Sequence, residues 1–398
     1  MHKGKYVFSQ LLDFLDKDVF LRLVNKYNVN RYVKQFTCWN QLAVLMFGQL
    51  LNRESLRDVV LATQVHASKA FHLGFGKHAS KSTLSDANNK RDYRIFEEFA
   101  YRVVAEARAC RADDIFKLGG NVYAIDSTTI ELCLETFKWA IYRKNQRKGG
   151  IKVHSVIHAN EGVPCDVQFT SAATNDSFML APSHYNHNEI VALDRAYINY
   201  AKFEELTDRG VVYVTKMKKN LSYEILVDCM HQNPEGLMEC RVQHVIFHKH
   251  VKDGEDIEHH ARIITYVDIK NGKARLVSLL TNDMNMEVED IVGIYRKRWE
   301  IELLFKQLKQ NFPLRYFYGE SANAIKIQIW VTLIANLLLM VMQRRIKRSW
   351  SFSNLATMFR IMLMYYVNCY TFFEHPERDW LKIIEMNNPQ PDEPALFD

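Results

Sequence analysis

The sequence predicts an α/β protein with helices at both ends of the chain and a mixed strand–helix core between them. Apolar residues near the N-terminus recur with a helical period, and from Gly120 onward short apolar runs alternate with turn residues. A long amphipathic segment then follows residue 285. The chain has 398 residues, which is too many for one compact core, and its 48% hydrophobic and 25% charged residues are ordinary for a folded protein.

Residues 1–115 are expected to form a helical domain. Phe8, Leu11, Leu15 and Val19 keep a 3.6-residue period. A long helix is expected over 82–108, where Ser or Thr at its start can cap it. Short helices with polar, basic tips are typical of helix-turn-helix DNA-binding domains, although small bundles that bind no nucleic acid have the same pattern.

Residues 116–216 are expected to form the first part of the core. Strands are predicted at 121–126, 149–159, 164–172, 189–194 and 211–217, with helices at 177–185 and 198–210. That order resembles the ribonuclease-H-like fold, in which one carboxylate lies on the first strand and another just after the fourth. Asp126 and Asp194 occur at those two places, each at the end of an apolar run.

The rest of the chain is expected to hold three further parts. Residues 217–279 are β-like with polar turns, which predicts an insertion into the core, and 280–345 are expected to complete the core with a catalytic helix. Residues 346–398 are expected to form a C-terminal helical region with an acidic tail. The longest largely apolar run, 329–342, is shorter than the ~20 residues needed to cross a bilayer, so we expect a buried core or interface helix and no membrane partner.

The charge distribution favours a polyanionic partner. The net charge is +6, and no Asp or Glu occurs between Glu135 and Glu161 or between Ser321 and Phe373. Clustered cations suit nucleic acid because they replace the counterions condensed on phosphates, although a solvated positive face explains either run as well. The candidate DNA contacts of the first run are Arg143, Lys144, Arg147, Lys148 and Lys152.

The seven cysteines are dispersed without CxxC pairs, which is typical of free thiols in a reducing cytoplasm. The N-terminal segment has acidic residues within its apolar stretch, so it is not read as a secretory signal. We therefore expect a cytoplasmic protein.

A polar stripe on the amphipathic segment supplies a third acid. Tyr295, Arg298, Glu302 and Lys309 follow at steps of +3, +4 and +7, which places them within a stripe about 60° wide on a helix. Together with the two aspartates, Glu302 predicts a site that holds Mg²⁺, or Mn²⁺ as a substitute. Two such ions can activate one oxygen and stabilise the leaving oxygen in phosphoryl transfer.

Two nearby features have competing interpretations. Trp299 could stack on an extruded base, but a tryptophan on an amphipathic helix belongs more often to the core. The histidines of the insertion suggest zinc, but their β-like spacing and the lack of matched cysteines favour ordinary strand residues: His244, His248, His250, His259 and His260.

The segment YRKRWEIELLFKQLK resembles the Tyr-(2)-Arg-(3)-Glu-(6)-Lys signature of the insertion-sequence-four (IS four) family of DDE transposases. It matches that signature at Tyr295, Arg298, Glu302 and Lys309. The contexts AIDSTTI, LDRAYI, YVTKMKKN and LLTND are also similar to that family, and the resemblance covers residues 5–345.

The resemblance implies a transposase that binds the terminal inverted repeats of its insertion sequence, cleaves there and joins the 3′-hydroxyl ends to target DNA, with a hairpin intermediate in relatives. It implies a bacterial, nucleoid-associated protein that acts as a homodimer on double-stranded DNA. The implied metal ligands are Asp126, Asp194 and Glu302, and the implied phosphate contacts are Tyr295, Arg298 and Lys309. We add to the DNA-contact candidates Trp299 and the basic residues of YVTKMKKN, which are Lys216, Lys218 and Lys219.

Two positions depart from the family pattern. Ala196 stands where Gly often follows the second Asp-Arg pair, and Asn175-Asp176 stands where a His-Asp pair is usual. The second departure keeps the acid and loses the imidazole, which puts an auxiliary role of that pair in doubt. Two other functions stay open: a catalytically silent DNA-binding regulator derived from a transposase, and a structure-specific nuclease with the same metal core.

Overall fold

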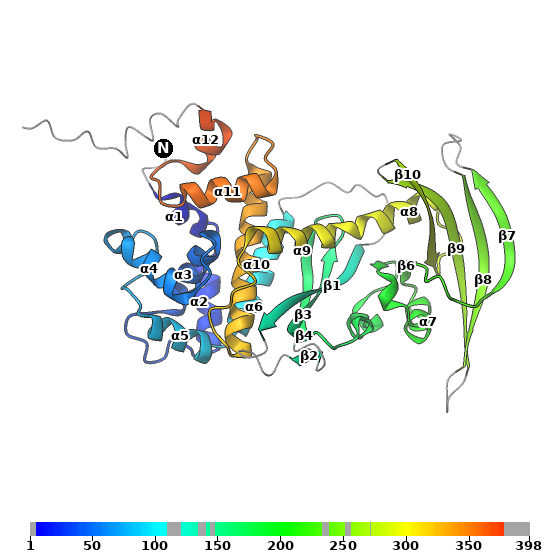
Figure 1. The fold of residues 1–398 in the computed structure, drawn as a ribbon, viewed down its shortest axis with the longest axis horizontal. Coiled ribbons are helices and arrows are strands. Elements are labelled where there is room, and N and C mark those ends of the chain that lie inside the picture. The colour runs from blue at the N-terminus through cyan, green and yellow to red at the C-terminus, as the bar shows by residue number, and fades with distance from the viewer. Residues whose placement is uncertain are drawn as a thin grey trace, which may run out of the picture. The chain divides into compact units, whose positions relative to one another are not determined.

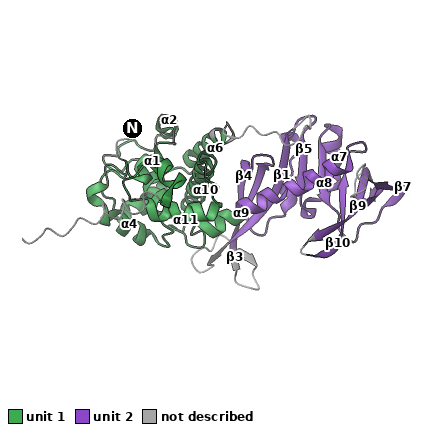
Figure 2. Ribbon diagram, turned by 90° about the horizontal axis from the view of Figure 1, so that it is seen from above, with its two compact units in different colours: residues 1–110, 306–398 green, residues 111–305 purple. Residues whose placement is uncertain are grey.

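The computed structural model describes residues 5–109, 121–133, 141–143, 148–232, 239–250, 256–270 and 272–377. The chain forms two compact units, coloured separately in Figure 2: unit 1 comprises residues 1–110 and 306–398, and unit 2 comprises residues 111–305. Figure 1 shows the helices of unit 1 and the sheet of unit 2. The predicted mixed α/β class, with N-terminal helices, a mixed sheet and C-terminal helices, is confirmed. The boundary at residue 306 lies inside the segment 280–345 that the sequence assigned to one part of the core.

The helices of unit 1 come from both ends of the chain. Polar side chains cap most of their N-termini; Thr37, for example, accepts from the Asn40 amide while Asn40 binds back to the Thr37 amide. The helices are α1 (Val7–Leu12), α2 (Lys17–Lys26), α3 (Cys38–Leu50), α4 (Leu56–Val65), the 3-10 turn η1 (Ala67–Lys69), α5 (Lys81–Lys90), α6 (Arg94–Ala109), α10 (Ala322–Arg345), α11 (Phe352–Met362) and α12 (Cys369–Glu374).

Helix α10 is the core element of unit 1. It contacts α3, α5, α6 and α11, and Trp330 on it is fully buried. By length and composition it is long and apolar enough to cross a membrane, but 94% of its most apolar 18-residue window is buried inside the protein. The predicted buried helix is therefore confirmed, and it is longer than the apolar run on which the prediction rested.

The helix predicted over 82–108 is wrong as a single element, because α5 ends at Lys90 and α6 begins at Arg94. Arg91 is extended (φ −80°, ψ 137°), and its buried guanidinium donates to the carbonyl of Thr37 at 2.9 Å and to Gln41 Oε1 at 3.0 Å. These hydrogen bonds to a distant segment keep Arg91 extended, although the local sequence would permit a continuous helix. The cap of α5 is Ser80, two residues before Ser82, where the predicted helix began.

Unit 2 is built on one mixed sheet that contains all ten described strands. Their order is β2-β3-β1-β5-β6-β10-β9-β8-β7, and β4 pairs with β3. Strands β1, β3 and β4 are antiparallel, whereas β5 is parallel to both β1 and β6. The bounds are β1 (Val122–Cys133), β2 (Ile141–Arg143), β3 (Lys148–His158), β4 (Val163–Ser171), β5 (Ile190–Leu193), β6 (Val212–Lys216), β7 (Glu224–Gln232), β8 (Glu239–Lys249), β9 (Ile257–Lys270) and β10 (Lys273–Thr281).

Two local predictions for the core are wrong. The helix expected at 177–185 is replaced by two 3-10 turns, η4 (Asp176–Met179) and η5 (Pro182–His184), since Pro182 lacks the amide that a continuing helix would use. Strand β1 does not end at Asp126 but continues to Cys133, because β3 pairs with it along its whole length.

The insertion extends the core sheet instead of forming a separate one. Strand β10 pairs antiparallel with β6, and β7 to β10 follow as a meander. Helix α7 (Tyr200–Asp208) covers one face through a buried cluster that includes Leu193, Phe203, Tyr213 and Ile263. Because successive strand residues point to opposite faces, the equally buried Ala192 faces the other side, where α8 (Val288–Lys297) contacts β5 and β6.

Candidate active site

Asp126 and Asp194 are brought together by two neighbouring parallel strands. Ile125 of β1 lies opposite Leu193 of β5, so the two aspartates follow directly at adjacent positions of strands ~4.8 Å apart. Strand β5 ends there, and Asp194 caps the 3-10 turn η6 (Arg195–Tyr197) by accepting from the Arg195 amide at 2.7 Å. The two acids therefore lie where the sheet opens between β1 and β5.

Arg298 joins Asp126 to the third predicted acid. Its Nη1 donates to Asp126 Oδ2 at 3.2 Å, and its Nη2 donates to Glu302 Oε1 at 2.5 Å. The Arg298 side chain is only 10% exposed, and its guanidinium carbon lies 5.5 Å from the centre of the Tyr295 ring. Hydrogen bonds between charged groups are about twice as strong as neutral ones, so Arg298 holds the two carboxylates in place.

The electrostatics of Asp126 reflect this crowding of acids. Burial raises the pKa of its carboxyl from 3.8 to about 6, and the negative charges of Asp194 and Glu302 act in the same direction. The Ser127 amide and the Arg298 charge oppose the rise of this pKa. The other two acids thus lie near enough to act on Asp126, and added positive charge would favour its ionised form.

The three acids offer only carboxylate oxygens, which are the donors that Mg²⁺ and Mn²⁺ prefer. In the part of the chain that the structure describes, no three His, Cys, Asp or Glu side chains are grouped so that they could hold a metal ion. The Arg298 guanidinium bonds to Asp126 and Glu302 and supplies the positive charge there. The carboxylate oxygens of the three acids are therefore chemically suited to bind a divalent cation. For all three acids to bind the same cation, Arg298 would have to release at least one carboxylate.

The predicted polar stripe does not lie on one continuous helix. Helix α8 ends at Lys297 and α9 (Trp299–Asn311) begins two residues later. The Arg298 amide bonds to the Tyr295 carbonyl at 3.2 Å, three residues back, which is a tight turn of 3-10 type. Tyr295, Arg298 and Glu302 still meet across this turn, whereas Lys309 is exposed on the part of α9 assigned to unit 1.

Trp299 does not belong to the core. Its side chain is 48% exposed at the start of α9, so the core position, which was the favoured prediction, is wrong. Trp330 of unit 1, by contrast, is fully buried.

The candidate basic DNA contacts differ in their surroundings. The side chains of Arg143 and Lys148 and the whole of Lys144 and Arg147 lie outside the described residues. Lys152 is largely buried, and its Nζ lies 3.2 Å from Asp176 Oδ1 and donates to the Thr174 carbonyl at 2.9 Å. The remaining lysines surround the end of β6: Lys216 is partly buried, and Lys218 and Lys219 are exposed.

The histidines of the insertion form no metal site among the residues described. His259 is fully buried and bonds to the Glu204 carboxylate and to the Tyr213 hydroxyl, the latter at 2.6 Å. It belongs to the packing between β9 and α7, in agreement with the prediction of ordinary strand residues.

Sequence reasoning missed a polar cluster beside Asp126. Ser127 donates its amide to Asp126 Oδ1 at 2.8 Å and its hydroxyl to Asp176 Oδ1 at 2.5 Å. His154 of β3 is fully buried, with Nδ1 3.8 Å from the same Asp176 oxygen, and burial lowers its pKa to about 4. The Asn175-Asp176 pair was the available signal, and the structure places the buried imidazole of His154 from β3 beside its acid.

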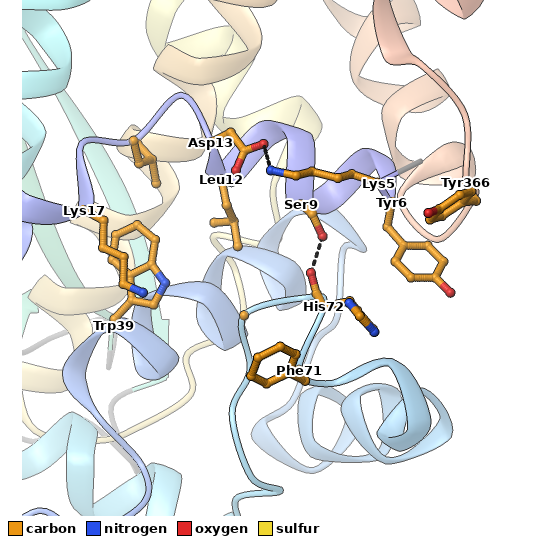
Figure 3. A pocket seen from close by; sticks show the side chains of 12 residues that line it. Lys5, Tyr6, Ser9, Leu12, Asp13, Lys17, Trp39, Phe71, His72 and Tyr366 are labelled. Atoms are coloured by element: carbon orange, nitrogen blue, oxygen red, sulfur yellow. Dashed lines mark hydrogen bonds and ion pairs between the residues drawn. The ribbon is translucent and has the colours of Figure 1, made fainter. Parts of the chain in front are cut away.

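Unit 1 contains a cavity of about 470 Å³ between α1, α3 and the loop around Phe71. Figure 3 shows that two of its polar groups are paired with each other, Lys5 with Asp13, and that Ser9 donates to the His72 carbonyl. None of the predicted catalytic residues lines this cavity.

Comparisons with known proteins find a family whose model covers almost all of unit 2. A family model described as "Transposase DDE domain" matches residues 117–338, and one described as "Domain of unknown function (DUF4372)" matches residues 3–76. The chain is 27% identical over 262 residues to a putative transposase (y4zB) of Sinorhizobium fredii, covering 66% of this chain and 71% of the relative. It is 26% identical over 267 residues to a putative transposase for insertion sequence element IS4SA of Synechocystis, covering 66% and 72%.

Among solved structures, the chain is similar to one in a cryo-EM structure of a piggyBac transposase synaptic complex with hairpin DNA. The match covers 98% of this chain and 86% of the transposase chain in that structure. It has 11% sequence identity and a TM-score of 0.44, which is too low to assign the catalytic fold. The assignment rests on the family match, which spans more than half of the chain. The protein therefore belongs to the DDE transposases and is a transposase of an insertion sequence that acts by phosphoryl transfer.

Proposed function

We propose that this transposase binds the terminal inverted repeats of its insertion sequence, hydrolyses DNA at the element's ends and joins the freed 3′-hydroxyls to target DNA. One observation carries the proposal: Asp126 and Asp194 follow paired residues of adjacent parallel strands, and Arg298 ties Glu302 to Asp126. Acids from three separate segments thus come together beside the end of β5, and such a set of carboxylates suits metal-dependent phosphoryl transfer.

The catalytic core is proposed to have the ribonuclease-H-like fold. The order β4-β3-β1-β5-β6 supports this, with an antiparallel β4-β3-β1 part followed by parallel β5 and β6. Helix α7 joins β5 to β6 as a crossover between parallel strands. The first acid lies on the first strand and the second directly after β5, as that fold would have them.

Asp126, Asp194 and Glu302 would hold Mg²⁺, or Mn²⁺ in its place, and we propose two ions. When bound, such ions activate the attacking oxygen and stabilise the leaving oxygen in an in-line displacement. The chain itself positions the acids on paired strands and an adjoining helix. Arg298 balances their charge before the cation arrives, which lets buried acids lie close together.

Tyr295, Arg298 and Lys309 are proposed to contact phosphates near the cleaved end. The Nε atom of Arg298 is buried and makes no hydrogen bond within the described chain, so it can donate to a phosphate oxygen once the side chain moves toward the DNA. The planar guanidinium can bind phosphate with two donors at once, whereas lysine acts as a point charge. Such contacts could hold the bent end of a hairpin intermediate.

DNA binding outside the site is proposed for the helical N-terminal region and for the lysines after β6. The transposase is proposed to act as a homodimer on paired ends in the bacterial cytoplasm. Because α10 packs against α3 and α6, the N-terminal helices lose their core when they are cut away. Binding of the terminal repeats is therefore best measured with the full chain.

The test is a time course of nicked, excised and strand-transfer products on labelled element ends in Mg²⁺. Neutral amides at the three acids should abolish nicking and leave end binding largely intact, because each removes an anionic ligand at almost unchanged volume: Asp126→Asn, Asp194→Asn and Glu302→Gln. The control is Glu300→Gln, a partly exposed acid two residues before Glu302.

Three outcomes would contradict parts of this proposal. Near-normal cleavage by any of the three variants removes that residue from the ligand set. Cleavage without strand-transfer product indicates a structure-specific nuclease. Binding of the ends without any cleavage by the wild-type chain indicates a silent regulator.

A further inference from the structure

We propose that Asp176 and Ser127 are positioning residues that orient the Asp126 carboxylate for its cation, with Lys152 keeping Asp176 in place. The proposal rests on the proposed role of Asp126 as a metal ligand. It assigns a role to the acid of the Asn175-Asp176 pair, which lies outside the set of three acids.

Ser127 contacts both acids at once. Its amide donates to Asp126 Oδ1 at 2.8 Å, and its hydroxyl donates to Asp176 Oδ1 at 2.5 Å. The amide is available because β5 pairs with β1 only as far as Ile125. An interaction that fixes the side chain of Ser127 therefore also restrains the amide that holds Asp126.

The Asp126 carboxylate is consequently held from two sides. Oδ1 accepts from Ser127, and Oδ2 accepts from Arg298. If Arg298 releases its oxygen when a cation binds, the Ser127 amide is the remaining described contact that sets the plane of this carboxylate. The orientation of Asp126 would then depend on what holds Ser127.

Asp176 is held by more than Ser127. Lys152 Nζ lies 3.2 Å from Asp176 Oδ1, and the Lys152 side chain is 14% exposed and anchored to the Thr174 carbonyl. His154 packs beside them with no exposed surface, and burial keeps its pKa low, so Lys152 supplies the positive charge. The negative charge of Asp176 is therefore paired with Lys152 in a largely buried environment. This pairing keeps the carboxylate in place as the hydrogen-bond acceptor for Ser127.

The segment that contains Asp176 also contacts the turn that follows Asp194. The 3-10 turn η4, which begins at Asp176, packs against η6, which follows Asp194. Tyr197 of η6 is 1% exposed, so this turn is anchored in the interior of the unit. Asp176 thus lies between the elements that carry Asp126 and Asp194, and displacing η4 would disturb both.

Partners of metal ligands typically change metal affinity or activity by ~10–100-fold when they are removed. Ser127→Ala and Asp176→Ala should therefore weaken binding of Mn²⁺ to the full chain without DNA by about tenfold or more. Ser127→Thr keeps the hydroxyl and should restore most of the affinity, and Asp176→Asn, which keeps an acceptor oxygen, should lie between. The measurement is the free Mn²⁺ signal in electron paramagnetic resonance during titration.

The link itself is tested by the double variant of Ser127→Ala and Asp176→Ala. It should bind Mn²⁺ no more weakly than the worse single variant, because both remove the same hydrogen bond. The control is Asp208→Ala, an exposed acid at the end of α7, which should leave the affinity unchanged. In cleavage assays the positioning variants should need about tenfold more Mg²⁺ and approach wild-type rates at saturation.

Wild-type Mn²⁺ affinity in Ser127→Ala would overturn the proposal even if Asp176→Ala proves too unstable to purify, because Ser127→Ala removes a single hydroxyl. Failure of Ser127→Thr to restore affinity would overturn it as well. If Asp126→Asn also binds Mn²⁺ normally and cleaves DNA, the proposed ligand role of Asp126 fails instead. If Asp126→Asn alone loses Mn²⁺, that role stands and only the positioning role is lost.

Discussion

Replacing Arg298 by alanine should destabilise unit 2 in the absence of divalent cations. Arg298 bridges Asp126 and Glu302 with a side chain that is 10% exposed, whereas those acids are 19% and 33% exposed. Removal of the guanidinium leaves two carboxylates close to Asp194 without a compensating charge. Electrostatic repulsion and the burial of Asp126 then both act against the folded state.

The expected loss follows from the burial of this ion pair. Removing one partner of a buried pair costs ~3–5 kcal/mol, and we take the lower end, about 3 kcal/mol, because Glu302 can regain water. For a unit of this size 1 kcal/mol shifts Tm by ~2–4 °C, so the transition should fall by roughly 6–12 °C. Mg²⁺ should restore part of this loss, and it should stabilise Arg298→Ala more than the wild type, whose arginine must first release a carboxylate.

The assay is thermal unfolding with and without Mg²⁺, followed by circular dichroism. Arg296→Ala is the matched control, since Arg296 lies two residues before Arg298 in the last turn of α8, is 66% exposed, and has its partner, Asp268 Oδ1, 3.8 Å away. An exposed pair of this kind contributes little, ~0–1 kcal/mol. Equal Tm shifts for the two variants, or no extra effect of Mg²⁺ on Arg298→Ala, would refute the view that Arg298 stands in for a cation.

Three further predictions concern the core, the DNA contacts and the metal. Trp330→Ala should lower the free energy of unfolding by ~3–5 kcal/mol, whereas Trp299→Ala, at 48% exposure, should change it by ~0.5 kcal/mol or less; equal losses in urea denaturation would contradict this. Replacing Lys218 and Lys219 together by alanine should weaken DNA binding for all sequences and reduce the salt slope of log K by about 2, and an unchanged slope would exclude phosphate contacts there. Removing Mg²⁺ with a chelator should stop cleavage and spare end binding, with Mn²⁺ restoring activity; cleavage that persists would contradict the metal requirement.

Residue type and spacing were enough to find the acids of the candidate site. Asp126 and Asp194 follow apolar runs that form neighbouring strands, and Glu302 lies four residues after Arg298, which is one turn of a helix. Such patterns are local, because an apolar run before an acid and the spacing of residues on one helix face can both be read along the chain. The site residues remain predictions, to be tested by the variants above.

Local sequence patterns could not predict the contacts between distant segments of the chain. Arg91 interrupts a predicted helix because its guanidinium bonds to carbonyls more than fifty residues away. The prediction treated the segments before and after Arg298 as one continuous helix. It therefore could not show that the chain turns at Arg298 and leaves Trp299 exposed. The strands of the insertion were predicted, but their continuity with the core sheet depends on the pairing of β10 with β6.

By itself the sequence determined the α/β class, the helical ends and the order of the strands along the chain, and it named the three candidate acids, because these depend on periodicity, turn residues and spacing along the chain. Only the tertiary structure decided that Arg298 bridges Asp126 to Glu302 and that Asp176 reaches Asp126 through Ser127. Hydrogen bonds between residues 49 and 172 positions apart form only after strands and helices have packed, and no local spacing encodes such a distance.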